Sequence, residues 1–201
     1  MKEQAQNRVL DPDDCEREPF AGVNASIRAH IAREKDESGE QLSYVYPSKV
    51  WEYPWSITRH AFPKDEIVLD AGCGVSALPI HLALGGATVI AIDNDRRWLD
   101  MEARAVRFHR VPVVPVLMAM EDLAFPDASF DRVYCISVLE HLPVENQAKA
   151  MREMARVLRP GGILYLTVDY DERERRSDDD VVYDRLAMQR YGVAPSGLEI
   201  E

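Results

Sequence analysis

The sequence predicts an α/β protein with a doubly wound, mostly parallel sheet and helices on both faces. Two observations lead to this fold class. Short apolar runs alternate with helix-like stretches from Glu66 onward, and the runs lack the polar alternation of a half-exposed antiparallel strand. Strands that are buried on both faces and joined by helices form parallel sheets. At 201 residues, 46% of them hydrophobic, the chain is long enough for one such core.

The expected elements alternate between strand and helix along the chain. The first strand is the run Ile67–Leu69. The helix Leu78–Leu84 follows it and ends at the Gly85-Gly86 pair, because glycine commonly terminates helices. A strong stop signal at Arg159–Gly162 precedes the last strand. The remaining strands are expected at Ala87–Ile92, Val113–Met118, Arg132–Val138 and Ile163–Val168, and the remaining helices at Arg96–Phe108 and Val144–Leu158.

Residues 1–42 form a polar, acidic extension, and residues 43–201 form the main domain. The extension contains a helix near Ala25–Glu34 but has too few large apolar residues for a core of its own, so it could serve as a lid. Five aromatic residues lie within the next segment, Tyr44–Trp55. They pack the extension onto the main domain in one interpretation and line a substrate pocket in the other.

Charge and cysteine content argue against several classes of protein. The chain has 24 Lys and Arg against 35 Asp and Glu, a net charge of −11, whereas a broad nucleic-acid surface needs clustered cations. The three cysteines and five histidines lack the spacing of a disulfide framework or a metal site. No stretch approaches the roughly 18 apolar residues of a membrane helix, and the N-terminus has no apolar signal region. We therefore expect a cytoplasmic protein with no nucleic-acid or membrane partner and no metal.

The first strand ends in a glycine-rich turn, in which Gly72 and Gly74 would let the backbone turn tightly and approach a ligand. This pattern alone also fits a nicotinamide dinucleotide site, but Asp70 would repel the diphosphate of a dinucleotide. The same carboxylate suits a cationic ligand, such as the ammonium and sulfonium groups of S-adenosylmethionine. A turn-forming role for Asp70 is the other interpretation.

Asp93 follows Gly72 at about the 20-residue spacing of the acidic ribose ligand in nucleotide-binding sheets. It ends the second strand, where its carboxylate could accept hydrogen bonds from two ribose hydroxyls. The alternative role for an acidic residue here is a helix N-cap. Asp95 fits that role better because it directly precedes the next helix. We therefore predict that Asp93 binds ribose.

Several segments, in this order, resemble class I S-adenosylmethionine-dependent methyltransferases of the small-molecule type. Val68–Gly74 resembles the first motif of the family, and Asp93 falls on its ribose-binding acid. Glu121–Val133 and Val138–Leu142 resemble its third and fourth strand regions, and Arg156–Gly162 resembles the turn before its fifth strand. Motifs in the right order are far more specific than a glycine loop alone.

The resemblance implies a Rossmann-like methyltransferase fold with S-adenosylmethionine as the methyl donor. It also implies which residues contact each part of the donor. These are Asp70, Gly72 and Gly74 at the methionine part, Asp93 at the ribose, Asn94, Met120, Glu121 and Asp122 at the adenine, and Ser137 and Val138 beneath the sulfonium.

The chain departs from the family pattern in three places. Ser76 replaces the third glycine of the first motif, and Ala119 stands where many members carry an adenine-binding Asp, so Glu121 is the expected substitute. After the fifth strand the chain has room only for a helix at Val181–Tyr191 and a short strand at Leu198–Glu201. The C-terminal strands of the sheet therefore look truncated. The exposed edge that results favours a homodimer, because unpaired strand edges recruit partners.

Methyl transfer from a sulfonium is an in-line displacement in which the donor supplies the reactive carbon. The protein mainly aligns donor and acceptor and excludes water, and it needs a base only for an acceptor such as a hydroxyl. His141 is the candidate catalytic base because an imidazole titrates near neutral pH. Packing of the loop is the alternative role for this histidine.

We expect an enzyme that methylates a small-molecule acceptor. Two other hypotheses remain open. One is a nicotinamide-dependent oxidoreductase, which only the glycine loop supports. The other is a non-catalytic, methyltransferase-like binding domain, which the missing terminal strands suggest. The charged run Asp171–Asp180 is interpreted as a solvated loop rather than a gate over the acceptor.

Overall fold

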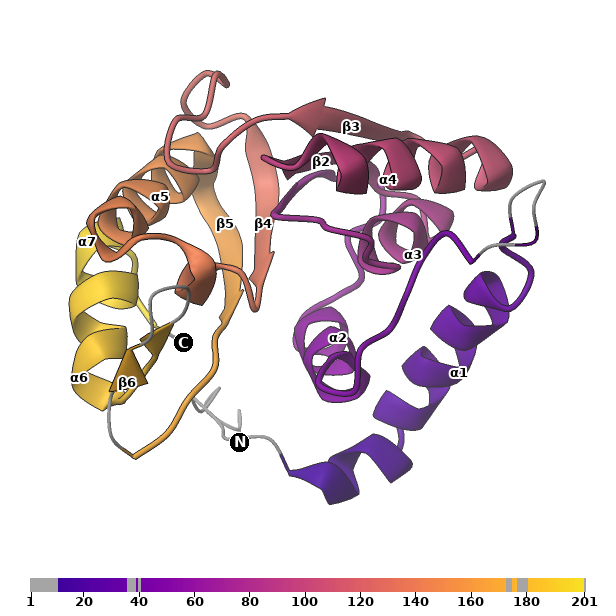
Figure 1. Ribbon diagram of the computed structural model, residues 1–201, viewed down its shortest axis with the longest axis horizontal. Helices are drawn as coiled ribbons and strands as arrows, with labels where there is room; N and C mark the ends of the chain where they lie inside the picture. Colours follow the sequence, from indigo (N-terminus) through magenta and orange to yellow (C-terminus); the bar gives the residue numbers. More distant parts are fainter. Residues whose placement is uncertain (1–10, 36–38, 40, 173–174, 177–180, 201) are drawn as a thin grey trace.

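The computed structural model describes residues 11–35, 39, 41–172, 175–176 and 181–200 of the chain. Its centre is a five-stranded parallel sheet with the strand order β3-β2-β1-β4-β5 (Figure 1). The predicted fold class is confirmed. The strands are β1 Ile67–Ala71, β2 Thr88–Asp93, β3 Val113–Leu117, β4 Phe130–Ile136 and β5 Leu158–Thr167.

Strand β1 lies in the middle of the sheet and pairs with both β2 and β4. From β1 the chain proceeds outward to β2 and β3, then crosses to the other side of β1 and adds β4 and β5. In open α/β sheets a ligand binds at such a reversal of strand order, outside the carboxyl ends of the strands. The loops that follow β1 and β4 are therefore the expected position of a binding site.

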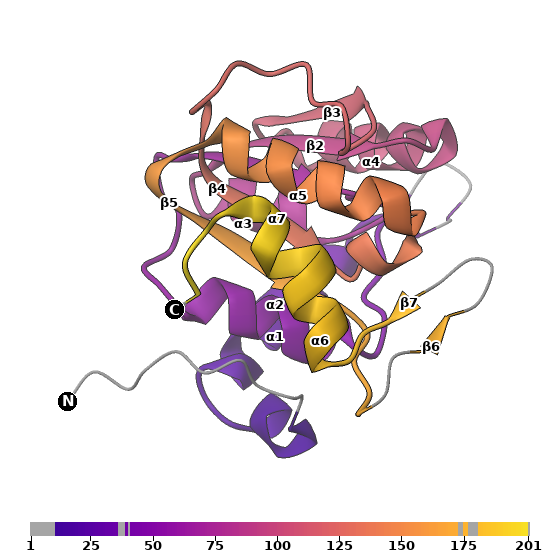
Figure 2. The ribbon, with the colours of Figure 1, turned by 90° about the vertical axis from the view of Figure 1, so that its left-hand side faces the viewer.

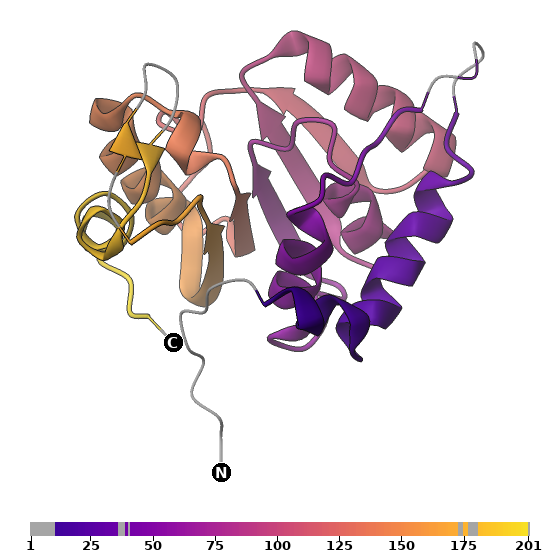
Figure 3. The same ribbon diagram turned by 60° about the horizontal axis from the view of Figure 1, so that its bottom comes forward.

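Helices cover both faces of the sheet, as the doubly wound architecture requires (Figure 3). Helices α1 to α4 lie on one side of the sheet, and α5 lies on the other side with the C-terminal helices. The helical elements up to residue 157 are η1 Pro12–Glu16, α1 Phe20–Ile31, α2 Lys49–Thr58, α3 Leu78–Leu84, α4 Arg96–His109, η2 Leu139–His141 and α5 Val144–Val157.

Neighbouring residues of β1 contribute to two hydrophobic cores, one on each face of the sheet. Val68 packs in a cluster with Ile80 of α3, whereas Leu69 packs in a second cluster with Met154 of α5. This division follows from the strand geometry, because successive side chains of a strand point to opposite faces. Figure 2 views the face that α5 covers. A sheet buried on both faces explains why the strands read as continuous apolar runs.

The N-terminal helices pack on the first of these cores. Ile27 of α1 is 1% exposed and belongs to that core. Helix α1 begins at Phe20, five residues before the predicted start, and Phe20 contacts Trp51 of α2 edge-on. Trp51 in turn stacks on Trp55, with 5.7 Å between the ring centroids. The aromatic segment thus packs the N-terminal helices onto the sheet. The division at residue 42 and the role of the extension as a lid stay predictions.

The predicted elements between residues 66 and 168 agree with the structure to within a few residues, with one exception. Strand β5 begins at Leu158, five residues before its predicted start, because Leu158 pairs with Phe130 of β4. The register then shifts before Ile163 pairs with Arg132. The stop signal Arg159–Gly162 therefore forms an irregularity within the strand. Gly161, whose φ is +79°, permits this geometry.

The C-terminal segment differs from its prediction. A helix is predicted over Val181–Tyr191, but Val181–Val182 form strand β7, which pairs antiparallel with β6 Arg175–Arg176. The helix begins later because Oδ1 of Asp184 accepts a hydrogen bond of 2.7 Å from the N–H of Ala187. From there the chain forms α6 Arg185–Ala187, the π-helical turn η3 Met188–Val193 and α7 Ala194–Ser196.

The predicted terminal strand at Leu198–Glu201 is wrong for residues 198–200, which are not in a strand, and Glu201 lies outside the described residues. Among the described residues, no strand pairs with the outer edge of β5. Most of the charged run predicted as a solvated loop or gate, residues 173–174 and 177–180, also lies outside them, as do residues 1–10 of the extension. In the part of the chain that the structure describes, no helix is long and apolar enough to cross a lipid bilayer.

Candidate functional site

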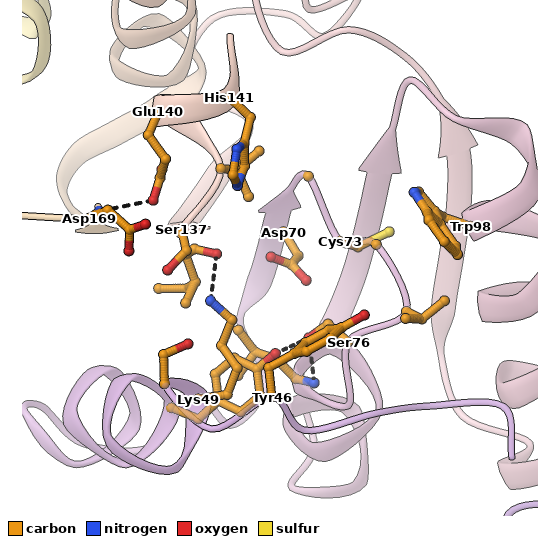
Figure 4. Close-up of a pocket in the computed structure, with 18 residues that line it drawn as sticks. Tyr46, Lys49, Asp70, Cys73, Ser76, Trp98, Ser137, Glu140, His141 and Asp169 are labelled. Carbon is orange, nitrogen blue, oxygen red and sulfur yellow. Dashed lines mark hydrogen bonds between the residues drawn. The ribbon is translucent and has the colours of Figure 1, made fainter. Parts of the chain in front are cut away.

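A cavity of about 380 Å³ lies at the carboxyl ends of β1 and β4, where the strand order reverses (Figure 4). Its volume is within the range of small-molecule sites. Five regions line it: the segment around the start of α2, the end of β1 with the glycine loop that follows, the first turn of α4, the loop and turn after β4, and the residues just after β5. Among the lining residues are Tyr46, Lys49, Tyr53, Asp70, Gly72, Gly74, Ser76, Trp98, Ser137, Val138, Glu140, His141 and Asp169.

Gly72, in the loop after β1, lies against Val138 of the loop after β4. Its φ is +85°, and a Cβ at this position would lie 2.4 Å from Cγ1 of Val138, so a larger residue cannot fit without displacing the second loop. Gly74 also has a positive φ, +53°, but open space surrounds it. The N–H groups of Gly72 and Cys73 both donate to the carbonyl of Ile92 in β2, at 2.9 Å. Both predicted glycines therefore lie in the cavity wall, on a loop fixed by the adjacent strand.

The carboxyl group of Asp70 points into the cavity (Figure 4). The residue is 3% exposed, and its Oδ2 has no hydrogen-bond partner among the described residues. Burial, followed by the negative charge of Asp93, raises the pKa of Asp70 to about 7, while the ammonium group of Lys49 acts in the opposite direction. An unpaired buried carboxyl oxygen is unfavourable. A cationic group of a ligand would therefore be stabilised beside Asp70.

Asp93 stabilises the glycine loop. Its Oδ2 accepts a hydrogen bond of 2.9 Å from the N–H of Gly74, and its Oδ1 accepts one of 2.8 Å from the N–H of Asp95. A carboxylate has about four acceptor positions, so it retains capacity for ribose hydroxyls. Asp95 caps α4 as predicted, through a 2.8 Å bond from the N–H of Arg97. Asn94 is exposed beside this turn and is not among the residues that line the cavity.

The three other residues predicted at the adenine follow β3 and do not line the cavity. Met120 is 6% exposed and packs in the core on the α5 face. Oε1 of Glu121 accepts a hydrogen bond of 3.0 Å from the side-chain amide of Asn146 in α5, and Asp122 is exposed. The structure therefore brings these residues to the same edge of the sheet as the cavity. Their contact with an adenine ring stays a prediction.

The loop after β4 presents Ser137 and Val138 to the cavity. Ser137 has a φ of +51°, a left-handed conformation that costs free energy for any residue with a side chain. Its N–H donates to both the hydroxyl and the carbonyl oxygen of Thr167 in β5, each at 3.0 Å. The neighbouring Val138 lies against Gly72. Contacts from β5 and from the glycine loop thus hold a strained turn at the cavity floor.

Glu140 and His141 form the wall opposite α2 (Figure 4). Glu140 is 1% exposed, and its Oε1 accepts a hydrogen bond of 3.0 Å from the N–H of Asp169, whereas its buried Oε2 has no partner among the described residues. Burial raises the pKa of Glu140 to about 7, against the lowering effects of backbone hydrogen bonds and of His141. His141, Glu140 and Asp169 thus line one wall of the cavity, and the charge of His141 acts on Glu140.

Tyr46 and Tyr53 line the cavity, so the aromatic segment Tyr44–Trp55 contributes to a pocket, as one of its two interpretations expected. Lys49 of α2, in contrast, was not predicted there. Lys49 and Tyr53 lie four residues apart and so on one face of this helix, and both line the cavity. Nζ of Lys49 lies 2.6 Å from Oε2 of Glu52, and the hydroxyl of Tyr53 lies 2.7 Å from Oγ of Ser76. The aromatic content of this segment hid its helical period. Counting the polar positions Lys49, Glu52 and Ser56 at helical spacing would have been the available signal.

Cys73 lines the cavity but is 2% exposed, and burial raises the pKa of its thiol well above the ordinary value. A protonated, buried thiol is a poor nucleophile, so Cys73 fills space beside the glycine loop. No group of three or more metal-ligating side chains gathers within the described ranges of the chain.

Comparison with known proteins identifies the class of this region. A family model described as a methyltransferase domain matches residues 69–166. A ubiquinone biosynthesis O-methyltransferase of Chromobacterium violaceum is 33% identical over 141 residues, which cover 69% of this chain and 58% of that protein. A protein of Mycobacterium tuberculosis named as a probable S-adenosylmethionine-dependent methyltransferase is 41% identical over 101 residues, which cover 50% of this chain and 34% of that protein.

A solved structure shares the fold over most of the chain. The [4+2]-cyclase SpnF matches 88% of this chain and 67% of its own, with a TM-score of 0.64 and 20% sequence identity, which shows the fold alone. The matched part of this chain spans 58% and 34% of the lengths of the two curated relatives.

Proposed function

We propose that this chain, whose residues 69–166 belong to the class I S-adenosylmethionine-dependent methyltransferases, transfers a methyl group to a hydroxyl of a small-molecule acceptor. The observation that carries the proposal is the buried carboxyl group of Asp70, whose Oδ2 finds no hydrogen-bond partner in the described part of the chain and lies in a cavity that Lys49 also lines. The amino-acid end of the donor carries one positive and one negative charge. The cavity offers a group of opposite sign to each.

Each polar part of the donor has a matching group. The donor ammonium would bind Asp70, and its carboxylate would bind Lys49, because charge-assisted hydrogen bonds are the strongest available in such a cavity. The ribose hydroxyls would bind the acceptor positions that Asp93 retains. Gly72 and Gly74 allow the backbone to approach the donor. The adenine would lie toward the end of β3, with Trp98 of α4 at the cavity edge and Asn94, Met120, Glu121 and Asp122 beyond it.

The reaction is an in-line displacement, for which the donor supplies a methyl group activated by the sulfonium. Ser137 and Val138 form the floor on which the sulfonium end of the donor would rest. They would direct its methyl group toward the cavity wall that contains His141. The imidazole of His141 accepts the proton of the acceptor hydroxyl as its oxygen bonds to the methyl carbon. The bond between the methyl carbon and the sulfonium sulfur of the donor would break, and its electron pair would stay with the sulfur. Alignment and exclusion of water supply most of the rate.

A small acceptor with a hydroxyl group agrees with four observations. The cavity is a few hundred Å³ in volume, and the net charge of −11 disfavours a nucleic-acid acceptor. His141, Glu140 and Asp169 together provide groups that can accept or pass on a proton, which a hydroxyl acceptor requires and a thiolate does not. The 33%-identical relative is named as an O-methyltransferase.

Two measurements test this function. Calorimetry with S-adenosylhomocysteine, the demethylated donor, is expected to show binding at a single site. A screen that follows donor consumption over a library of hydroxylated metabolites is expected to yield a methyl ether. No binding of S-adenosylhomocysteine at millimolar concentration would refute the donor site. Methylation of nitrogen alone in the screen would refute the hydroxyl acceptor and leave the donor site standing.

The alternatives are less well supported. A nicotinamide dinucleotide would bring its diphosphate against the buried Asp70, whereas the matched domain is that of methyltransferases. Donor binding without methyl transfer was suggested by the missing terminal strands, and it agrees with the fact that the structure of a cyclase shares this fold, since a fold by itself does not fix the reaction. Donor binding with no turnover in the screen would favour it. The predicted homodimer through the edge of β5 also stays a prediction.

A further inference from the structure

We infer that Glu52, on α2, is a positioning residue for methyl transfer and acts through Lys49 and Ser137. This inference rests on the proposed function, because it assigns Glu52 a role in the binding of the donor. Glu52 lies outside the region matched by the methyltransferase family. It is 7% exposed and does not line the cavity, so it would not touch the donor itself.

The carboxylate of Glu52 joins three elements that surround the cavity. Its Oε1 accepts hydrogen bonds from the hydroxyl of Ser137, after β4, and from the hydroxyl of Thr167, at the end of β5, the second at 2.9 Å. Its Oε2 lies 2.6 Å from Nζ of Lys49, one turn earlier on α2. The side chains of Lys49 and Glu52 are 11% and 9% exposed. Removal of one partner from an ion pair buried to this degree leaves the other charge uncompensated.

The first consequence concerns the turn at Ser137. The left-handed backbone conformation of Ser137 needs contacts from other residues to persist, and the structure supplies them to its side-chain hydroxyl and to its backbone N–H. Glu52 holds the hydroxyl, and Thr167, itself bonded to Glu52, holds the N–H. Val138, the next residue, lies against Gly72 of the glycine loop. Glu52 thereby fixes the floor on which the reactive end of the donor would rest.

The second consequence concerns Lys49. Its ammonium is held between Oε2 of Glu52 and the carbonyl of Ile136, at 2.6 and 3.3 Å. This anchoring keeps the ammonium in the cavity wall, close enough to Asp70 to lower the pKa of that residue. A lysine side chain is flexible, so its charge is useful to a bound carboxylate only if something fixes its position. Glu52 provides that restraint.

Two substitutions separate these roles. Glu52→Gln keeps an amide oxygen for the hydroxyls of Ser137 and Thr167 but removes the charge opposite Lys49, whereas Glu52→Ala removes all three contacts. We expect the Kd for S-adenosylhomocysteine to rise about tenfold in Glu52→Gln and about a hundredfold in Glu52→Ala. Turnover of the donor should show a raised KM in both variants, with a clear loss of kcat only in Glu52→Ala.

Glu66→Gln and Glu66→Ala are the matched controls. Glu66 also makes an ion pair, with Arg132 at 2.6 Å, in which the Arg132 side chain is 7% exposed and the Glu66 side chain 31%, but it lies at the amino end of β1, away from the cavity. These controls should lose stability and keep the wild-type Kd. Thr167→Val is the further variant if the Glu52 variants do not fold, because it removes the shared hydroxyl and leaves the charges in place. It is expected to raise the Kd about three- to tenfold.

The outcomes separate the inference from the function on which it rests. The wild-type chain and the folded Glu52 variants could bind S-adenosylhomocysteine with the same Kd, with only a smaller fraction of each variant able to bind. In that case Glu52 is merely structural and the inference fails. If Glu66 variants weaken binding as much as Glu52 variants do, it also fails. If the wild-type chain binds no S-adenosylhomocysteine, the proposed function fails first.

Discussion

Asp70 makes the binding of the donor dependent on pH in a way that the structure predicts quantitatively. Its pKa is raised to about 7 in the folded, ligand-free protein, first by burial and then by Asp93. An ammonium group of the donor interacts favourably only with the ionised carboxylate. Below pH 7 donor binding must therefore expel a proton from Asp70, and affinity falls as the pH falls.

The magnitude follows from the fraction of the protein that is competent to bind. With a pKa of about 7, Asp70 is about 90% ionised at pH 8 and about 1% ionised at pH 5, so the Kd for S-adenosylhomocysteine should rise about 90-fold between these values. Asp70→Asn cannot ionise. Its Kd should be about 100-fold higher than that of the wild type at pH 8, because it resembles the protonated wild type, and nearly constant between pH 5 and pH 8.

Stability should change with the opposite sign. The pKa of Asp70 is raised from 3.8 when unfolded to about 7 when folded, so the folded state binds the proton more tightly. The contribution of Asp70 to the free energy of unfolding is therefore complete below pH 3.8 and is lost as the pH rises through about 7. Asp70→Asn avoids that loss and should be the more stable protein above neutral pH, by at most about 4 kcal/mol.

Calorimetric titrations between pH 5 and pH 8, with urea unfolding of both proteins at the same pH values, measure these effects. A pH dependence of the wild-type size in Asp70→Asn would refute the reasoning, because another group, such as Glu140, whose pKa is also raised to about 7, would then be the titrating group. A flat wild-type profile would refute it as well.

Three further changes test other parts of the site. Gly72→Ala should abolish the binding of S-adenosylhomocysteine and lower the free energy of unfolding by about 2–4 kcal/mol, because a Cβ would lie 2.4 Å from Val138. Gly161→Ala, at a positive φ with open space around it, should lower the free energy of unfolding by about 1–2 kcal/mol and leave binding intact. Equal losses of the two variants in urea unfolding would contradict this. Lys49→Met should raise the Kd for S-adenosylhomocysteine about 10- to 100-fold. The midpoint of the pH dependence of this Kd should move above 7, because Lys49 lowers the pKa of Asp70. Calorimetry that finds the midpoint unmoved would be the contrary result. His141→Gln should lower kcat for a hydroxyl acceptor by about 10²- to 10⁴-fold and leave the affinity for S-adenosylhomocysteine unchanged. Wild-type rates of product formation in a single turnover would exclude His141 as the catalytic base.

Local chemistry was enough to predict the sheet and its glycine loop. The apolar runs around Val68 and Val133 are continuous because both faces of the sheet are buried, and Asp95 precedes α4 as an N-cap because few other residues satisfy the free N–H groups there. The prediction failed at Val181–Tyr191, where a short hairpin precedes the helix. Two apolar residues cannot distinguish a strand from a helix by their period.

The order of residues along the chain also determined that Asp70 and Asp93 end neighbouring strands, and thus lie at one edge of the sheet, because parallel strands end on the same side. Only the tertiary structure decided which groups face them. Lys49 and Glu52 precede β1 by more than a dozen residues, yet α2 brings them against the ends of β4 and β5, where hydrogen bonds to Ile136 and Thr167 hold them. Such contacts depend on the packing of a helix across the sheet. The pKa of a carboxyl group depends on the same packing, because burial and neighbouring charge come from parts of the chain distant in sequence.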